Sequence, residues 1–392
     1  MTVTLGWLVY VLAAGHIDRV GDNLIASVTM IFGSFVAGST PQGGGAVAFP
    51  VFTKGLEIPA EVARTFSLSI QTIGMGTASL AIAARSKPVE RRALMWGIPA
   101  AVIGFLFGLY VLGDPDLPYW PSRVPGPWVK VLFTVLIASM AAALWLEYRA
   151  PLIERRFSLA STMRVRILLV TALFVGGVIS SLTGSGTDVV LYVLVAVVLG
   201  VSPQVAVPTS VMAMAAVSIV GLLVLGLYDG QLATTLDGSS VTELGGDAVR
   251  SVDGKTVFAD QGDLLEATRF DLFGLWLAAV PVVAWGAPLG AWLASRMRDR
   301  HLVRLVVALA SLEVLSTIIF LEELRSDAVL AVSGALGVLL VTALLAMARK
   351  RRASLTDGPV DVVGGDRIDV DDSLAEALKR KTPTNPTEGD QK

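Results

Sequence analysis

Cysteine is absent from this chain, and histidine occurs only as His16 and His301. Without cysteine the protein has no disulfide, no thiolate nucleophile and no cysteine-bound metal. Two histidines are too few to build a histidine metal cluster. The sequence also lacks the GxxxxGK[ST] loop with which a chain cradles ATP phosphates. We therefore expect no metal, no other cofactor and no direct coupling to ATP within the chain.

Charge is scarce as well. Only 16% of the 392 residues are charged, whereas 54% are hydrophobic. Soluble domains are about 25% charged. The net charge is −2, and the charged residues are concentrated in short stretches that separate long uncharged ones. This composition indicates a protein embedded in the lipid bilayer, and it argues against a nucleic-acid partner.

Nine apolar runs are long enough to cross a bilayer as helices. They cover 23–39, 61–84, 93–112, 129–146, 165–183, 204–227, 272–294, 302–321 and 328–347. Two shorter apolar runs, 45–53 and 187–199, each follow a glycine-rich break. The pattern predicts an all-α polytopic membrane protein.

The two ends of the chain depart from this pattern. Residues 1–22 lack the basic start and the small-residue cleavage site of a signal peptide. Their apolar part is too short to span comfortably, so we expect a helix at the membrane interface. Residues 353–392 are polar and carry mixed charge, with too little apolar surface to fold alone. We expect them to form a disordered cytoplasmic tail.

Basic residues form four clusters, and these orient the membrane segments. The clusters lie at 85–92, 149–166, 296–304 and 349–352. Because basic residues next to membrane segments stay in the cytoplasm, we place all four there, together with the C-terminus, in a multi-pass protein of the inner (plasma) membrane. The connections at 113–128, rich in Pro and Trp, and at 229–269, acidic with a hairpin-like SVDGKTVF, then lie outside.

Two glycine-rich segments read as two copies of one unit. The first starts at Gly33 with GSFVAGSTPQGGGAVAFP, and the second starts at Gly176 with GGVISSLTGSGTDVVLYV. Interrupted membrane segments at equivalent places in two halves point to the binding site of a secondary transporter. At offsets of 141 to 145 residues the matches are Gly33 with Gly177, Gly43 with Gly184, Gly55 with Gly200, Pro59 with Pro203, Ala63 with Ala206 and Ser67 with Ser210.

The membrane sides predicted for the loops give the two units opposite orientations in the membrane. Unit one, residues 23–150, begins outside and reaches the cytoplasm at Arg85. Unit two, residues 164–323 with the insertion 229–269, begins inside and reaches the outside by Tyr228. Each needs an odd number of crossings, so the short runs either cross or form re-entrant pairs. We expect the glycine-broken or re-entrant helices to meet near mid-membrane, and 327–348 to be a final transmembrane helix.

The glycines of the breaks allow the backbone to leave the helix and expose its amides. A helix that begins just after them directs its positive end at the same place, which favours an anion. Glycines also serve close packing between membrane helices. Because the two clusters occupy matching positions, and each is followed by a Pro and a Ser-bearing helix, we favour an anion site.

Hydroxyl and amide side chains gather beside both breaks and in the helices that follow them. Such donors suit a small oxyanion that must also be released, although Ser and Thr equally cap helix backbones or bond between helices. The predicted substrate-binding residues are Gln42, Gly43, Gly44, Gly45, Arg64, Ser67, Gln71, Gly184, Ser185, Gly186, Thr209 and Ser210.

Three charged residues in or beside apolar runs have several interpretations. Asp188 precedes the run VVLYVLVAVV and is either a site for a coupling proton or a cap of the helix that follows. Arg64 has the geometry to hold a sulfonate or carboxylate with two hydrogen bonds, to pair with Glu61, or to extend to the interface. Glu313 lies within the run 302–321 without an evident partner, and we expect it to bond between helices.

Four motifs surround the breaks: AGSTPQGGGAVAFP and ARTFSLSIQTIGM in unit one, and LTGSGTDVVLYV and AVPTSVMAMAAVS in unit two. Together they resemble the TauE/SafE sulfite exporter family over most of 23–347. The resemblance implies an all-helical inverted-repeat transporter that moves sulfite, sulfonates or related organic anions, commonly outward. The chain departs from the family pattern at Phe66, where a Thr is expected, in its GSG break with Asp188, and in the insertion 229–269.

Two other classes of function stay open. An integral-membrane enzyme would convert its substrate, but the membrane runs hold neither a Ser–His pair nor the paired Asp motifs of lipid-phosphate chemistry. An anion channel would need no alternating access and would show no saturation. We expect a secondary transporter in the lipid bilayer with a small anionic substrate: an exporter of sulfite, an organosulfonate or a related small organic anion, with Asp188 as the site for a coupling proton.

Overall fold

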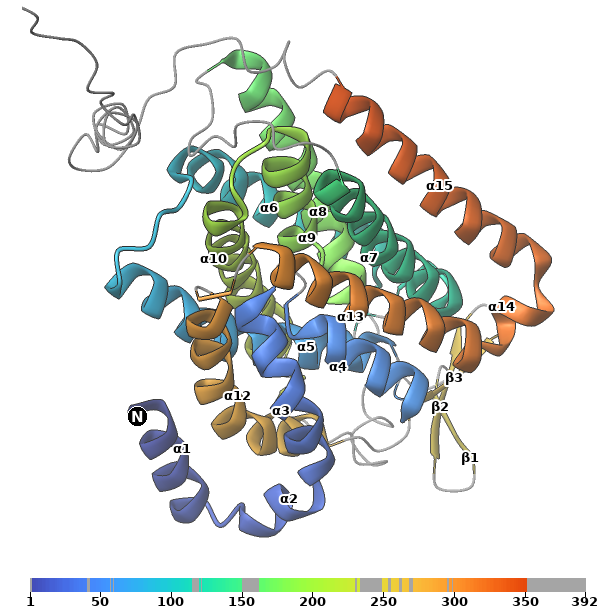
Figure 1. The fold of residues 1–392 in the computed structure, drawn as a ribbon. Helices are drawn as coiled ribbons and strands as arrows, with labels where there is room; N and C mark the ends of the chain where they lie inside the picture. Colours follow the sequence, from blue (N-terminus) through green and yellow to red (C-terminus); the bar gives the residue numbers. More distant parts are fainter. Residues whose placement is uncertain are drawn as a thin grey trace, which may run out of the picture.

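A computed structural model describes most of the chain. The described residues are 2–40, 43–56, 58, 60–114, 120, 122–149, 162–229, 231–232, 249–252, 255–260, 263–267, 271–294, 296–297 and 299–350. The tail 353–392, expected to be disordered, lies outside them. Nearly all of the described elements are helices (Figure 1).

The helices follow the predicted apolar runs. Those of unit one are α3 (Leu24–Ser39), α4 (Gly45–Pro50), the π helix η1 (Val51–Gly55), α5 (Ala60–Ala84), α6 (Arg91–Leu112) and α7 (Gly126–Arg149). Those of unit two are α8 (Met163–Thr183), α9 (Thr187–Tyr192), η2 (Val193–Val198), α10 (Pro203–Gly221), η3 (Leu222–Tyr228), α12 (Leu272–Ala294) and α13 (Asp299–Phe320). The flanking helices are α1 (Thr2–Ala13), α2 (Ile17–Asp22), α14 (Glu322–Ser326) and α15 (Ala328–Lys350).

Seven of the described helices are long and apolar enough to cross a membrane. Lipid offers no hydrogen-bond partner to the backbone, and a helix satisfies its own amides and carbonyls along such a run. The segments α4–η1 and α9–η2 are too short for this, and they lie among the longer helices. The chain is therefore a multi-pass membrane protein with two short helical segments inside it.

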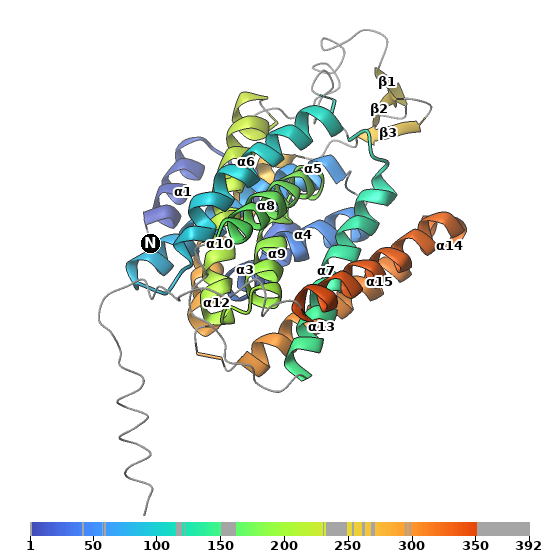
Figure 2. The same ribbon diagram turned by 90° about the horizontal axis from the view of Figure 1, so that it is seen from above.

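Helices α5 and α10 pack on each other at the centre of the molecule. Around them α3 packs along α12, and α6 packs along α8 (Figure 1). Helices α7, α13 and α15 form a group at one side, which is clearest from above (Figure 2). The short segments bridge the centre and this side: α4–η1 contacts α5 and α13, whereas α9–η2 contacts α10, α7 and α15.

Helix directions show which ends of the molecule lie together. Helices α6 and α8 are parallel, because Gly97 lies against Leu173 in the middle of α8, and Gly108, further along α6, lies against Ser181 near the end of α8. The same comparison makes α5 parallel to α12 and α7 parallel to α15. The ends of α5, α7, α12 and α15 and the starts of α6 and α8 therefore share one end of the molecule. The described basic residues at this end come from all four clusters and include Arg85, Arg164, Arg296 and Lys350.

Glycines let the paired helices approach closely. A Cβ at Gly177 in α8 would overlap the carbonyl oxygen of Ala101 in α6. In the other pair, a Cβ at Gly38 in α3 would overlap the carbonyl oxygen of Ala287 in α12. The packing use of glycine, which competed with the anion-site interpretation, thus holds for these helical positions outside the two breaks.

The N-terminal segment packs against α12. The Trp7 indole donates to the Leu277 carbonyl over 2.8 Å, so α1 runs beside part of α12. The guanidinium of Arg19 in α2 forms an ion pair with Asp271, just before α12 begins. The interfacial position expected for residues 1–22 stays a prediction.

The insertion 229–269 is the part of the described structure that contains β-strands. Its described part contains β1 (Val249–Val252), β2 (Lys255–Asp260) and β3 (Asp263–Ala267), which form an antiparallel sheet in that order. Strands β1 and β2 pair as the hairpin expected from SVDGKTVF. The all-α expectation holds for the membrane part, but it was incomplete for this insertion.

Replacing Gly177 with Ala should destabilise the fold, because the added Cβ meets backbone that cannot turn away. Overpacking of this kind costs about 1–3 kcal/mol. Gly76→Ala is the matched control, since nothing lies within 4 Å of a Cβ at that position in α5. Thermal unfolding in detergent should give a lower midpoint for Gly177→Ala than for the parent and for Gly76→Ala. Equal midpoints would contradict the close contact between α6 and α8.

Candidate functional site

Each glycine break contains one left-handed glycine at a matching position. Helix α3 ends at Ser39 and α4 starts at Gly45, while α8 ends at Thr183 and α9 starts at Thr187. Between them Gly43 has φ +67° and Gly184 has φ +74°. Both values lie in the left-handed region, which glycine adopts without the steric cost of a Cβ. The two matched glycines are therefore required by the turns themselves.

The second break is held by two side chains of α5. The Gln71 amide nitrogen donates to the Gly184 carbonyl over 3.0 Å and to the Ser67 hydroxyl over 2.6 Å. Ser67 Oγ in turn donates to the same carbonyl over 3.3 Å. A backbone carbonyl freed by the end of α8 is thereby satisfied inside the protein, as a break within the membrane requires.

The first break contacts the same two side chains from the other side. A Cβ at Gly45 would lie 2.5 Å from Ser67 Oγ, 2.8 Å from Gln71 Nε2 and 3.0 Å from Ser185 Cβ. The predicted meeting of the breaks is therefore present in the structure, with α5 between them. The expected residues that come together here are Gly43, Gly45, Ser67, Gln71, Gly184, Ser185 and Asp188.

Asp188 is fully buried at the start of α9. Its Oδ1 accepts from the backbone amides of Gly186 over 3.1 Å and Val189 over 2.9 Å, and the Ser185 hydroxyl lies 3.3 Å from both carboxyl oxygens. Asp188 is the second residue of α9 and Gly186 is the N-cap, so the expectation of Asp188 as the N-cap was wrong, although its carboxylate accepts from amides at the start of the helix. Its Oδ2 faces the first break, since a Cβ at Gly43 would lie 2.6 Å from it. The carboxyl group therefore satisfies one break and borders the other.

The two short helices differ in how their first amides are satisfied. At α9 the Thr187 amide donates to Ser180 Oγ over 2.9 Å, beside the amides that bond to Asp188. The N-cap of α4 is Gly44, and none of the described side chains caps that helix. The amides at the start of α9 thus already have protein acceptors beyond the helix backbone.

Three buried polar atoms, on the last residue of α3 and on α5, have no hydrogen-bond partner within the described part of the chain. They are Gln71 Oε1, Ser39 Oγ and Ser69 Oγ. Each belongs to a residue that is at most 1% exposed. Buried polar atoms without a partner are rare and call for an explanation, such as a bound polar ligand. For Gln71 the donor half of the amide is used, whereas the acceptor half faces Gly43.

A family model described as Sulfite exporter TauE/SafE matches residues 25–318. The chain belongs to this family. The match runs from α3 to α13 and so includes both breaks. Membership makes the chain a membrane transporter of sulfite or related anions. The search of curated proteins and the search of solved structures gave no match.

Several residues predicted for the site of this transporter lie elsewhere. Thr209 Oγ1 accepts from the Glu90 amide over 2.9 Å, which places it at the start of α6. Ser210 Oγ donates to the carbonyl of Val207 in its own helix over 2.9 Å. Neither hydroxyl is bonded to a break, because α10 turns them toward α6 and toward its own backbone. Gly186 serves as the N-cap of α9, and Gln42 lies outside the described residues.

Arg64 is 1% exposed, so its extension to the interface was a wrong expectation. The guanidinium donates over 3.2 Å to the carbonyl of Ser181, near the end of α8, and over 3.1 Å to the carbonyl of Trp120 in the connection after α6. Trp120 is itself buried and has φ +47°. Arg64 thus ties that connection to the helix that leads into the second break.

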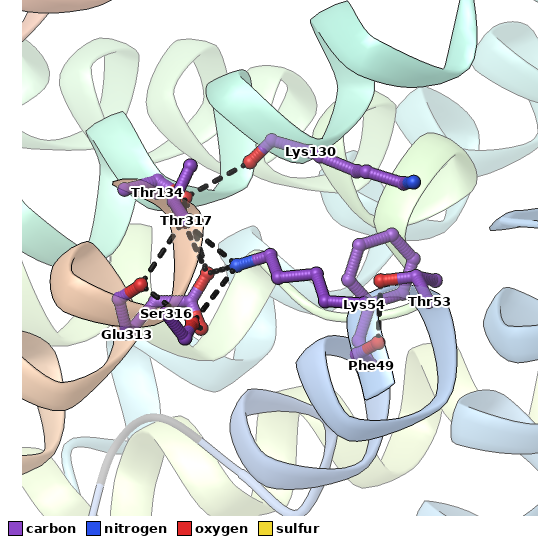
Figure 3. Close-up of polar contacts among 8 residues, drawn as sticks. All are labelled: Phe49, Thr53, Lys54, Lys130, Thr134, Glu313, Ser316 and Thr317. Atoms are coloured by element: carbon purple, nitrogen blue, oxygen red, sulfur yellow. Dashed lines mark hydrogen bonds and ion pairs between the residues drawn. The ribbon is translucent and has the colours of Figure 1, made fainter. Parts of the chain in front are cut away.

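One buried charged residue escaped the sequence interpretation. Lys54 Nζ lies 2.6 Å from Glu313 Oε1, and both side chains are buried (Figure 3). The expected bond between helices at Glu313 is therefore an ion pair. The sequence offers one signal for this pair. A basic residue, Lys54, follows the apolar run 45–53, and an acidic residue, Glu313, lies inside the apolar run 302–321. A separation of 259 residues gave no local hint that the two groups meet.

Proposed function

We propose that this protein is a secondary transporter that exports sulfite, an organosulfonate or a related small organic anion, and that the anion binds where the two glycine breaks meet. The observation that carries the proposal is the contact of both breaks with Ser67 and Gln71 in the buried part of α5. Two interrupted helices from two units that share one site suit alternating access, because each unit is able to close one side of it.

The anion is assigned to the start of α4, beside Gly43, Gly44 and Gly45. Helix α4 continues directly into η1, so the positive end of a longer helical segment points at the break. The donors of Ser67 and Gln71 now bond to the Gly184 carbonyl, which is a neutral acceptor. An anion is a stronger acceptor, and it would compete for these donors while still being released.

Proton coupling follows from the position of Asp188. Its Oδ2 borders Gly43, so a carboxylate there repels an anion at the start of α4. Protonation removes this repulsion, and an anion and a proton then favour each other's binding. One proton carried with one monovalent anion moves no net charge, so the concentration gradients set the direction. Export then runs when the outward concentration gradient of the anion exceeds the inward gradient of protons.

An inverted repeat is supported by how the helices exchange partners. The first long helix of each unit packs along the third long helix of the other, α3 with α12 and α8 with α6. The remaining equivalent helices pair with each other, α5 with α10 and α7 with α13. The shared left-handed geometry of Gly43 and Gly184 fits the same relation. A twofold axis in the membrane plane would relate units 23–150 and 164–323.

We place the end that carries the basic clusters in the cytoplasm, which also puts the C-terminus there and the protein in the plasma membrane. The chain has no native cysteine, so single cysteines report sidedness directly. In intact cells, an impermeant maleimide should label Ser326→Cys and should label Ser86→Cys only after the cells are opened. Both positions are exposed. Labelling of Ser86→Cys in intact cells would show that the topology is the reverse of the one proposed.

The anion site is tested by two adjacent glycines. Gly45→Ala should abolish flux of sulfite and of a panel of sulfonates and carboxylates in proteoliposomes, because its Cβ would displace Ser67, Gln71 and Ser185. Gly44→Ala is the matched control, since it keeps the backbone amide and an ordinary helical φ of −69°, and the nearest atom to its Cβ is the flexible end of Met30 at 3.3 Å. Gly44→Ala should keep most of the flux. Parental flux in Gly45→Ala, at equal protein content, would rule out the site.

The coupling role is tested by Asp188→Asn. The side-chain oxygen of asparagine accepts the same bonds from the Gly186 and Val189 amides, so the unfolding midpoint should stay near that of the parent. Asp188→Ala leaves these buried amides without that acceptor and should cost about 1–3 kcal/mol. Asparagine does not titrate, so anion flux should lose its response to an imposed pH gradient and persist as exchange. A full response to the gradient in Asp188→Asn would show that the proton is carried elsewhere.

A further inference from the structure

Lys54 and Glu313 form a second charged centre within the membrane part, apart from the glycine breaks. Lys54 Nζ bonds to Glu313 Oε1 over 2.6 Å and to the Thr317 hydroxyl over 2.7 Å. Thr134 of α7 donates to Glu313 Oε1 over 3.1 Å and bonds to Thr317 Oγ1 over 2.7 Å. These contacts join η1, α13 and α7 (Figure 3).

The pair is costly for a purely structural contact. The side chains of Lys54 and Glu313 are 2% and 4% exposed, so both charges have left water almost completely. An apolar pair of similar volume often stabilises a protein as well or better. Ionisable groups inside membrane proteins are, moreover, functional by default because they are expensive there. The centre is therefore better explained by a change of charge during the transport cycle than by stability.

The position of Lys54 links this centre to the proposed anion site. Lys54 lies in η1, which continues α4, the helix that begins with the glycines of the first break. By the match of Gly55 with Gly200, its counterpart in unit two is Leu199, a buried apolar residue beside η2. One short segment is thus held by a charge and the other by apolar contacts. Only the charged contact of the first segment changes when a group takes up a proton.

We propose that Glu313 is a second proton-binding site of the transporter, and that its protonation releases Lys54 and lets α4–η1 move relative to α13. This inference rests on the proposed function. When the Glu313 carboxylate takes a proton it becomes neutral, and Lys54 stays an ammonium held only by the hydroxyls of Ser316 and Thr317. The proton leaves when the pair forms again. Movement of α4–η1 then carries the glycines of the first break toward or away from Ser67.

The charged groups that face this centre, in the described part of the chain, come from three elements. They are Lys54 from η1, Glu313 from α13 and Lys130 from α7. The Lys130 carbonyl accepts from Thr134, while its amine lies apart from the carboxyl of Glu313 (Figure 3). Lys130 therefore provides a matched control: a lysine of the same neighbourhood that leaves the ion pair in place when it is changed.

The test measures a distance and needs no substrate. Nitroxide labels at Gly55→Cys and Phe320→Cys, both exposed positions, report the separation of η1 from the end of α13 in the full chain in nanodiscs. At neutral pH one short distance is expected, and at mildly acidic pH a longer population should appear. Glu313→Gln should show the longer population at both pH values, and Lys130→Met should respond like the parent. An unchanged distance in the parent would overturn the proposal.

Transport measurements separate a proton-binding role from a structural one. Lys54→Met combined with Glu313→Leu keeps the contact apolar and should stay folded, but it should lose the pH response of the distance and slow proton-driven flux by roughly 5- to 150-fold, the usual range of coupling between sites. The exchanged pair, Lys54→Glu with Glu313→Lys, should restore both. Parental flux and pH profile in the apolar pair would overturn the proposal. If the distance in the parent depends on pH but Gly45→Ala keeps parental flux, the proposed anion site is refuted and the role of Glu313 is not.

Discussion

Everything at the centre of this protein depends on one hydrogen-bonding constraint: a backbone that leaves the helix within a membrane must find its partners inside the protein. Helix α5 supplies them, because Ser67 and Gln71 bond to the Gly184 carbonyl where α8 ends. The same side chains then lie against the glycines of the first break. The side chains that bond to the backbone of the second break thus also contact the first break. Together they form a polar site between helices that are otherwise apolar.

Glycine has two uses here, and the backbone angles separate them. At Gly43 and Gly184 the backbone is left-handed, and the residue is needed for the turn. At Gly38 and Gly177 it is needed because a neighbouring helix comes too close for any side chain. Close helix pairs fix the frame on both sides of the breaks, whereas the left-handed glycines redirect the chain between them.

Much of the fold was predictable because membrane helices leave a strong local signal. Apolar length gave the helices, positions of Arg and Lys gave their common end, and the glycine match gave the meeting of the breaks. Side-chain direction was not predictable in the same way. Ser67 and Ser210 match in sequence, yet one hydroxyl faces a break and the other bonds to its own helix. Lys54 was missed because its partner lies 259 residues away, and such pairings have no local pattern.

The exchange of partners between the units also bears on how the chain assembles. Helix α3 is synthesised early, but the helix that packs along it through close glycine contacts is α12, which lies about 250 residues later in the chain. Until that segment emerges, the face of α3 that carries Ser34 and Gly38 has only lipid or other proteins beside it. Neither unit completes its own packing, so the two halves become native together, late in synthesis, and a nascent chain that stops before Leu272 leaves α3 without its counterpart.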